Sequence, residues 1–203
     1  MKRQGRLLVI SGPSGTGKGT ICARIIEELD DIVLSVSATT RPMRKGEVHG
    51  ENYYFLTREE FEEKIAAGGF LEHATVYDNY YGTPREKVFE MLENGIDVVL
   101  EIDVQGAMKV RKSYPDGVFI FILPPSMAEL RKRITTRATD AVDVIELRMS
   151  KALSEIAFAE KYDYYVINDV LDEAVAEVKA IITAEHARVT EEISAVIEGY
   201  KEE

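Results

Sequence analysis

The sequence predicts an α/β fold in which helices flank a mostly parallel sheet. Four short runs at 7–10, 98–103, 118–123 and 164–167 are mainly apolar, as expected for strands buried on both faces. Segments with helical spacing of apolar residues alternate with these runs, which is typical of a parallel sheet. The 203 residues fit one domain with a single large core.

The first strand, 7–10, leads into a glycine-rich loop and then a helix over 20–29, with Ile21, Ile25, Ile26 and Leu29 on one face. A short strand is expected at 33–37. From there to about residue 90, glycine, asparagine, tyrosine and charged residues alternate with short apolar pieces. This texture predicts short strands and turns, and we interpret the segment as an inserted subdomain.

Core elements resume with the strand 98–103, which ends in carboxylates, and the strand 118–123, which Pro124 and Pro125 stop. Helices are expected at 128–134 and 142–160, with a charged, turn-prone piece over 135–140 between them. The last strand, 164–167, ends at Asn168.

Apolar residues in the tail, 172–203, recur at helical spacing. We expect a helix whose first half docks on the core. The second half is expected to project, and it could pair with another subunit; the chain is therefore a monomer or a homo-oligomer.

The charge balance of 25 basic and 36 acidic residues gives a formal net charge of −11. Such a chain is a poor general binder of nucleic acid, so any bound phosphate needs local cations. The one cysteine, Cys22, is expected to be a small buried residue on a helix. The sequence has neither a transmembrane-length apolar run nor a signal-peptide core, so we expect a cytoplasmic protein without a membrane partner.

The most specific motif is Gly12-Pro13-Ser14-Gly15-Thr16-Gly17-Lys18-Gly19-Thr20, which fits G-x-x-x-x-G-K between a buried strand and a helix. Backbone N–H groups of such a loop, together with the helix N-terminus, bind a polyphosphate, and Lys18 bridges its β- and γ-phosphates. The motif predicts ATP binding by residues 12–20 and a sheet of the P-loop NTPase type. A glycine-rich turn without a ligand is the rejected alternative.

Gly19 departs from the common motif, which has Ser or Thr after the lysine to ligate Mg²⁺. Nucleoside monophosphate kinases often have G-K-G-T, so the departure is typical of that group. We expect Mg²⁺ to accompany ATP and to be held by phosphates and water, with Thr20 as an indirect partner through water and no direct protein ligand.

Two arginines, Arg41 and Arg44, lie three residues apart in the segment that follows the 33–37 strand. Such a pair can bind a phosphate bidentately, although solvated surface charge is the usual role of arginine. Arg131, Arg133, Arg137 and Arg148 form a further cluster, for which a basic helix surface is the alternative.

Several segments resemble the guanylate kinase family in order and spacing, and with the loop and 131–148 the resemblance covers roughly residues 5–185. They are Ser37 to Arg44, Gly46-Glu47-Val48-His49-Gly50-Glu51-Asn52-Tyr53-Tyr54-Phe55, Phe70-Leu71-Glu72, Asn79-Tyr80-Tyr81-Gly82-Thr83, and Glu101-Ile102-Asp103-Val104-Gln105-Gly106.

The resemblance implies a core at 5–36 and 95–185, a GMP-binding insertion at about 37–90, a short lid at about 131–148 and a C-terminal helix at about 172–203. It implies that Arg41, Arg44, Tyr53 and Tyr81 bind the GMP phosphate and that Ser37, Glu72 and Thr83 contact the guanine. Asp103 matches an acidic residue between the acceptor and the phosphate-binding loop.

In the lid, the resemblance implies that Arg133, Arg137 and Arg148 close over the phosphates. The family's usual Arg-Gly-Thr is Arg137-Ala138-Thr139 here; losing that glycine restricts the backbone but removes no charge. Asn168 matches a position beside the donor adenine; a turn residue is the alternative.

Glu72 can accept hydrogen bonds from guanine N1–H and from its exocyclic amino group together. Adenine lacks this donor pair, and such polar mismatches can reject a substrate by factors of about 10⁴. The resemblance therefore implies transfer of the γ-phosphoryl group of ATP to GMP, with Lys18, Arg41, Arg133, Arg137, Arg148 and Asp103 in the catalytic set. The alternatives are a monophosphate kinase for another base and a non-catalytic guanylate-kinase-like module that binds proteins.

Overall fold

A computed structural model describes residues 4–76, 78–137, 142–190 and 193–201. Its main sheet has five strands in the order β2-β7-β1-β8-β9, and every pair in it is parallel. The strands are β1 (Leu7–Ser11), β2 (Ile32–Leu34), β7 (Asp97–Glu101), β8 (Val118–Leu123) and β9 (Tyr164–Ile167). The α/β class expected from the apolar runs is confirmed.

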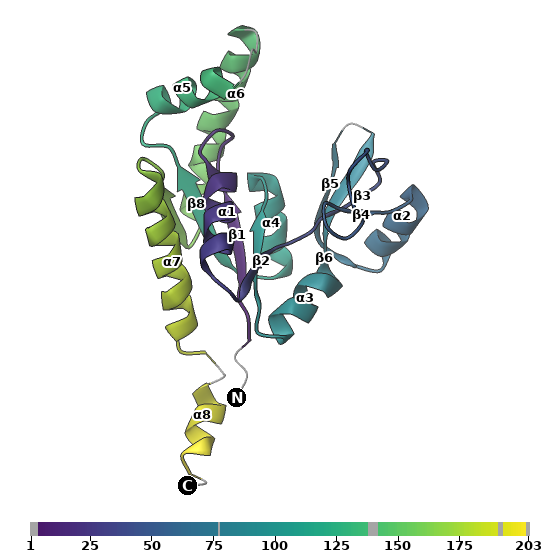
Figure 1. Ribbon diagram of the computed structural model, residues 1–203, viewed down its shortest axis with the longest axis vertical. Helices are drawn as coiled ribbons and strands as arrows, with labels where there is room; N and C mark the ends of the chain where they lie inside the picture. The colour runs from purple at the N-terminus through teal and green to yellow at the C-terminus, as the bar shows by residue number, and fades with distance from the viewer. Residues whose placement is uncertain (1–3, 77, 138–141, 191–192, 202–203) are drawn as a thin grey trace.

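Helices cover both faces of this sheet (Figure 1). On one face lie α1 (Lys18–Glu28) and α7 (Leu171–Ala187); on the other lie α3 (Arg85–Glu93) and α4 (Val104–Ser113). Successive side chains of β1 point to opposite faces of the sheet. Leu8 and Ile10 pack against α1 and α7, whereas Leu7 and Val9 pack against α3 and α4.

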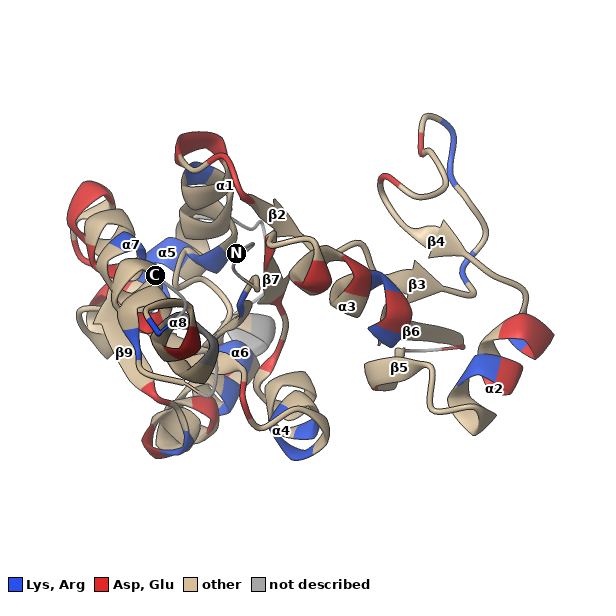
Figure 2. Ribbon diagram, turned by 90° about the horizontal axis from the view of Figure 1, so that it is seen from below, with Lys and Arg blue, Asp and Glu red and all other residues tan. Residues whose placement is uncertain are grey.

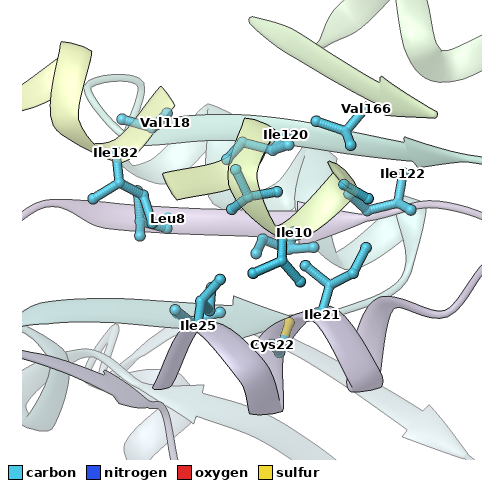
Figure 3. Packing of buried hydrophobic residues seen from close by; sticks show 14 of the residues in the cluster. Leu8, Ile10, Ile21, Cys22, Ile25, Val118, Ile120, Ile122, Val166 and Ile182 are labelled. Carbon is cyan, nitrogen blue, oxygen red and sulfur yellow. The ribbon is translucent and has the colours of Figure 1, made fainter. Parts of the chain in front are cut away.

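Figure 3 shows the first of these cores, in which side chains of α1 meet those of the central strands. Ile21, Cys22 and Ile25 are at most 2% exposed. Burial raises the pKa of the Cys22 thiol to about 12, so this cysteine is a packing residue, as expected from the sequence. The core fixes α1, and with it the loop that precedes it.

A second, four-stranded sheet has the order β4-β3-β6-β5 and lies to the side of the first (Figure 1). Its strands are β3 (Ala38–Thr39), β4 (Tyr54–Phe55), β5 (Phe70–Val76) and β6 (Asn79–Pro84), and α2 (Arg58–Ala66) packs on it. Phe61 of α2 stacks on Phe70 and on Tyr80, with ring centroids 4.3 and 5.3 Å apart.

The two sheets meet where α4 packs on β5. Leu71 of β5 is buried in the same core as Val110 of α4. Ser113 Oγ donates to the Leu71 carbonyl at 2.9 Å, and Lys109 Nζ donates to the His73 carbonyl at 2.6 Å. We call this contact the α4–β5 junction.

A helix pair, α5 (Met127–Arg137) and α6 (Val142–Ile156), stands at the carboxyl end of β8 and packs around Leu130, Ile134 and Met149. A 3₁₀ helix, η1 (Ala157–Lys161), continues α6. The turn was expected to begin at residue 135, but Thr135 and Thr136 still belong to helix α5. Their hydroxyls donate to the carbonyls of Arg131 and Lys132, each four residues earlier.

Other boundaries also differ from expectation. Helix α1 starts at Lys18, two residues before the expected start. The strand expected at 33–37 corresponds to β2, which ends at Leu34, and the helix expected to reach 160 ends at Ile156. The 98–103 strand ends at Glu101, because Asp103 caps α4: its Oδ1 accepts from Gly106 N at 2.8 Å. Helices α2, α3 and α4 were not anticipated.

The single helix expected over the tail is wrong: α7 ends at Ala187 and a separate helix, α8 (Ile193–Gly199), follows. Arg188 adopts an extended backbone at the end of α7, and the next two residues, Val189 and Thr190, are β-branched and poor helix formers. Before this break, His186 Nε2 lies 2.6 Å from Asp97 Oδ2, which ties the end of α7 to the start of β7. Helix α8 extends away from the sheet (Figure 1).

Candidate active site

The glycine-rich loop lies at the carboxyl end of β1, and α1 begins at Lys18 directly after it (Figure 1). The loop is held in shape by its own bonds, since Thr16 Oγ1 donates to the Pro13 carbonyl at 2.9 Å. Its position at a helix N-terminus, with the buried strand before it, is the arrangement that binds phosphate groups.

Two of the loop's glycines are required by the backbone and its surroundings. Gly12 has φ 142°, and a Cβ there would lie 2.3 Å from the Ile122 carbonyl oxygen. Gly17 has φ 90°, and a Cβ there would lie 2.3 Å from Asn168 Nδ2. A larger residue at Gly12 would have to move the backbone of β8, and one at Gly17 would strain the left-handed backbone and displace the Asn168 side chain.

Substituting Gly12 with alanine is therefore expected to lower the free energy of unfolding by about 3 kcal/mol, through backbone strain and the clash with β8. Urea denaturation followed by circular dichroism measures this. Gly199→Ala is the matched control, because a Cβ there would have nothing within 4 Å. Equal denaturation midpoints for the two variants would contradict the prediction.

The Lys18 ammonium lies over the loop, with Nζ donating to the carbonyls of Gly12 at 2.7 Å and Pro13 at 2.9 Å. Burial lowers its pKa, and the nearby carboxylates of Glu101, Glu155 and Asp103 oppose that shift. A partly desolvated cation at this position attracts phosphate oxygens more strongly than an exposed one would.

Asn168 and Arg133 join the loop to its neighbours. The Asn168 side-chain amide donates to the Thr16 carbonyl at 2.8 Å, and the Asn168 carbonyl accepts from Arg133 Nη1 at 2.9 Å. Arg133 Nε also donates to Glu129 at 3.1 Å. Asn168 is 6% exposed, so in this structure it braces the loop; a contact with adenine stays a prediction.

A second cluster forms around Glu72 on β5. Thr83 Oγ1, on the neighbouring strand β6, donates to Glu72 Oε1 at 2.9 Å. Burial raises the pKa of Glu72 and the charge of Asp103 adds to this, while Thr83 and Lys109 act in the opposite direction. Two of the three residues expected to contact guanine, Glu72 and Thr83, are thus in direct contact, and the nearby Asp103 carboxylate also acts on Lys18.

A third cluster gathers Arg41, Tyr53 and Tyr81. The Arg41 guanidinium lies 5.5 Å from the centroid of the Tyr53 ring, and the Tyr53 and Tyr81 rings are 6.1 Å apart, edge to face. Glu47 pairs with Arg41, with Nη2 and Oε1 2.7 Å apart. Three of the four residues expected to bind the acceptor phosphate therefore lie together.

The remaining expected residues lie around these clusters. Ser37 is half-buried before β3, and its carbonyl accepts from Tyr54 N at 2.9 Å. Arg44 is on the exposed loop between β3 and β4, which carries charges of both signs in Figure 2. Arg148 is exposed on α6, and Arg131 pairs with Glu146 of that helix. The Arg137 side chain and all of Ala138 lie outside the described residues.

Sequence reasoning assigned no role to Glu47 or Glu101. The Glu101 carboxylate oxygens would lie 3.4 Å from a Cβ at Gly19, so this acid stands beside the first turn of α1. Its position at the carboxyl end of the apolar strand β7 was a readable signal. The pairing of Glu47 with Arg41 was not readable, because it depends on how the loop 41–47 folds.

A cavity of about 620 Å³ lies away from these clusters. Arg6 and Val118 line it at the amino ends of β1 and β8, together with Tyr114, Glu185 and Arg188. In parallel α/β sheets, ligands bind beyond the carboxyl ends of the strands, so this cavity is not the nucleotide site. No helix among the described residues has the length and apolar character needed to cross a membrane.

Comparisons with known proteins agree with this geometry. The family model described as guanylate kinase matches residues 4–185. The guanylate kinase of Caldanaerobacter subterraneus subsp. tengcongensis is 57% identical over 189 residues, covering 93% of this chain and 92% of the relative. That of Clostridioides difficile is 50% identical over 201 residues, covering 99% and 98%.

Among solved structures, a guanylate kinase from Anaplasma phagocytophilum matches with a TM-score of 0.70 at 38% identity, covering 93% of this chain and 89% of that one. A shikimate kinase from Bacteroides thetaiotaomicron matches with a TM-score of 0.50 at 16% identity, which shows a shared fold alone. The family model and the relatives both span the phosphate-binding loop and the Glu72 cluster, and on these grounds the chain belongs to the guanylate kinase family.

Proposed function

We propose that this chain transfers the γ-phosphoryl group of ATP to GMP, giving ADP and GDP. The observation that carries the proposal is the position of Asp103. Its charge acts both on Lys18, in the loop that would hold the donor phosphates, and on Glu72, in the cluster that would hold the acceptor base. One carboxylate therefore lies near both the proposed donor site and the proposed acceptor site.

For the acceptor, Glu72 accepts the two guanine N–H donors, and Ser37 and Thr83 supply hydroxyls. The four residues that bind the phosphate are Arg41, Arg44, Tyr53 and Tyr81. Local cations are needed here because acidic residues are spread over α2, α3 and α7 (Figure 2), and the formal net charge is −11. The guanidinium of Arg41 is the cation placed among the tyrosines.

For the donor, residues 12–20 cradle the ATP phosphates, and Asn168 lies beside the loop. A phosphate oxygen of GMP attacks the γ-phosphorus in line, and the bond from that phosphorus to the β–γ bridging oxygen breaks as the new bond forms. The nucleophile is already an anion near neutral pH, so no general base is needed. Lys18, Arg133, Arg137 and Arg148 neutralise the charge that develops, and Asp103 lies between the two substrates.

The residues present fit Mg²⁺ bound mainly by phosphates and water. Gly19 offers no hydroxyl, and the described residues contain no cluster of three or more acidic, histidine or cysteine ligands. The oxygens of Glu101 and Thr20 beside the start of α1 suit a hydrated magnesium ion. When bound, Mg²⁺ supplies charge neutralisation at the β- and γ-phosphates.

An assay of ADP release with GMP, AMP, CMP and UMP supplied separately tests the proposal. We expect turnover with GMP at least about 10³-fold above that with AMP, because AMP leaves the half-buried Glu72 carboxylate with no partner beyond Thr83. Chelating Mg²⁺ with EDTA is expected to abolish the activity. Equal turnover with AMP would contradict only the base assignment, whereas ADP release that GMP does not stimulate would contradict the transfer reaction itself.

A further inference from the structure

We propose that Glu47 is a positioning residue in the acceptor site. It holds the Arg41 guanidinium so that one edge of the guanidinium faces the GMP phosphate. The inference rests on the proposed role of Arg41 and adds a residue that does not itself touch the substrate. The contacts of Glu47 with Arg41 and Arg44 carry it.

The contact between Glu47 and Arg41 is bidentate and shielded from solvent. Arg41 Nη2 donates to Glu47 Oε1 at 2.7 Å and Nη1 donates to Oε2 at 3.1 Å. The two side chains are 13% and 20% exposed. Paired charge-assisted bonds of this kind fix the plane of a guanidinium, which the flexible arginine side chain would not hold alone.

The edge that Glu47 uses leaves the other edge for a second anion. A guanidinium has five N–H donors. Two of them bond Glu47, and a further one, on Nη1, donates to the Pro42 carbonyl at 2.8 Å. The remaining two, on Nε and Nη2, form the side edge, whose spacing matches two phosphate oxygens.

The surroundings of Arg41 support this orientation. Its guanidinium lies within 5.5 Å of the Tyr53 centroid and 5.7 Å of the Phe55 centroid. The hydrogen bond to Glu47 raises the pKa of Arg41, and the nearby Tyr81 hydroxyl acts in the same direction. Arg41 is therefore placed between Glu47 and the two tyrosines expected to bind the same phosphate.

Glu47 also closes the loop that carries both arginines. Its Oε2 accepts from the backbone N–H of Arg44 at 2.7 Å, and its own N–H donates to the Arg44 carbonyl at 3.1 Å. Hydrogen bonds and the nearby arginines lower the pKa of Glu47, so the carboxylate stays ionised at neutral pH. Because the acid is bonded to the loop backbone, a phosphate could displace it only by opening the loop.

Isothermal titration of GMP and of guanosine, which lacks the phosphate, tests the proposal in Glu47→Gln, Arg41→Ala and the double variant. In Glu47→Gln we expect the Kd for GMP to rise about tenfold and that for guanosine to stay unchanged. In the Arg41→Ala background the same change should have little further effect, because the two residues act through one contact. Glu51→Gln, an exposed acid on the same loop, is the matched control.

Tighter GMP binding in Glu47→Gln would overturn the proposal, since it would mean that Glu47 competes with the phosphate. Unchanged GMP affinity, or an equal loss for guanosine, would also overturn it. If Arg41→Ala binds GMP normally, the proposed phosphate-binding role of Arg41 is wrong. If Arg41→Ala binds GMP weakly but Glu47→Gln binds it normally, only the inference about Glu47 is wrong. Thermal melting of each variant verifies that it is folded.

Discussion

Replacing Lys18 with alanine is expected to lower kcat by about 10³-fold or more, with GMP binding nearly unchanged. The ammonium donates to two loop carbonyls, and its partial burial strengthens its interaction with the charge that would develop on the transferred phosphoryl group. Its expected partner is the donor nucleotide, whereas the acceptor cluster lies on the second sheet.

A coupled assay of ADP release at saturating ATP and GMP gives kcat, and titration with GMP alone gives the acceptor affinity. Lys112→Ala, which removes an exposed lysine on α4, is the control for loss of one positive charge. A Lys18→Ala variant that retained more than about one tenth of the wild-type kcat would contradict the assigned role. Loss of GMP affinity in the same variant would contradict the separation of the two sites.

Glu72→Gln is expected to lower kcat/KM for GMP by about 10³-fold, because the amide presents a donor where guanine also presents donors. The substitution keeps the shape of the side chain and an oxygen to accept from Thr83 Oγ1. Activity with AMP should not fall in parallel, since adenine makes no use of this carboxylate. The GMP-to-AMP ratio therefore separates a change in base recognition from a general loss of structure.

The raised pKa of Glu72 gives this prediction a pH dependence. The proposed contact with guanine needs the ionised carboxylate, so kcat/KM for GMP should fall as the pH drops through a pKa above the ordinary value of 4.5. Stability runs the other way. The folded state holds the proton more tightly than the unfolded state, so protonation stabilises the fold as pH falls through that folded pKa.

Glu72→Gln removes a charge whose burial is unfavourable, and the variant should therefore melt at a higher temperature than wild type at pH 7. Differential scanning calorimetry at pH 7 and pH 5 measures the effect, and the difference between the proteins should shrink at the lower pH. Glu86→Gln, at an exposed acid in α3, is the control. A lower melting temperature for Glu72→Gln at pH 7 would show that the ionised carboxylate stabilises the fold.

Much of the main sheet could be predicted, because a strand that is buried on both faces has a continuous apolar sequence. The runs at 118–123 and 164–167 have the same bounds as β8 and β9. The phosphate-binding loop was also found in its expected setting, since its glycines serve positions such as Gly12 that other residues cannot occupy.

The missed helices show what single-sequence periodicity cannot resolve. Helix α2 begins with a capping box in which Thr57 and Glu60 bond each other's backbone, and this pattern was readable. It went unrecognised because α2 is short and its one fully buried residue is Phe61, so the apolar stripe is weak. Asp103 was read for its charge alone, although the same carboxylate begins α4.

The contacts within the site could not be predicted from spacing. Glu72 and Thr83 are paired by the register of β5 against β6, which is broken by an irregularity between Phe70 and His73. Asn168 lies against Thr16 only because β9 follows β8 and β1 in the sheet. The family resemblance named these residues, but the sheet order explains why they meet.

In the proposed reaction, the α4–β5 junction contributes to the separation of the two substrates. The phosphate-binding loop belongs to the five-stranded sheet, whereas Glu72 and Arg41 belong to the second sheet or its loop, so the proposed donor and acceptor sites lie on different sheets. The distance across which the phosphoryl group would move therefore depends on packing at Leu71 and Ser113, neither of which belongs to either binding cluster. A change of spacing at the α4–β5 junction should therefore leave the affinities for ATP and GMP unchanged and lower kcat alone.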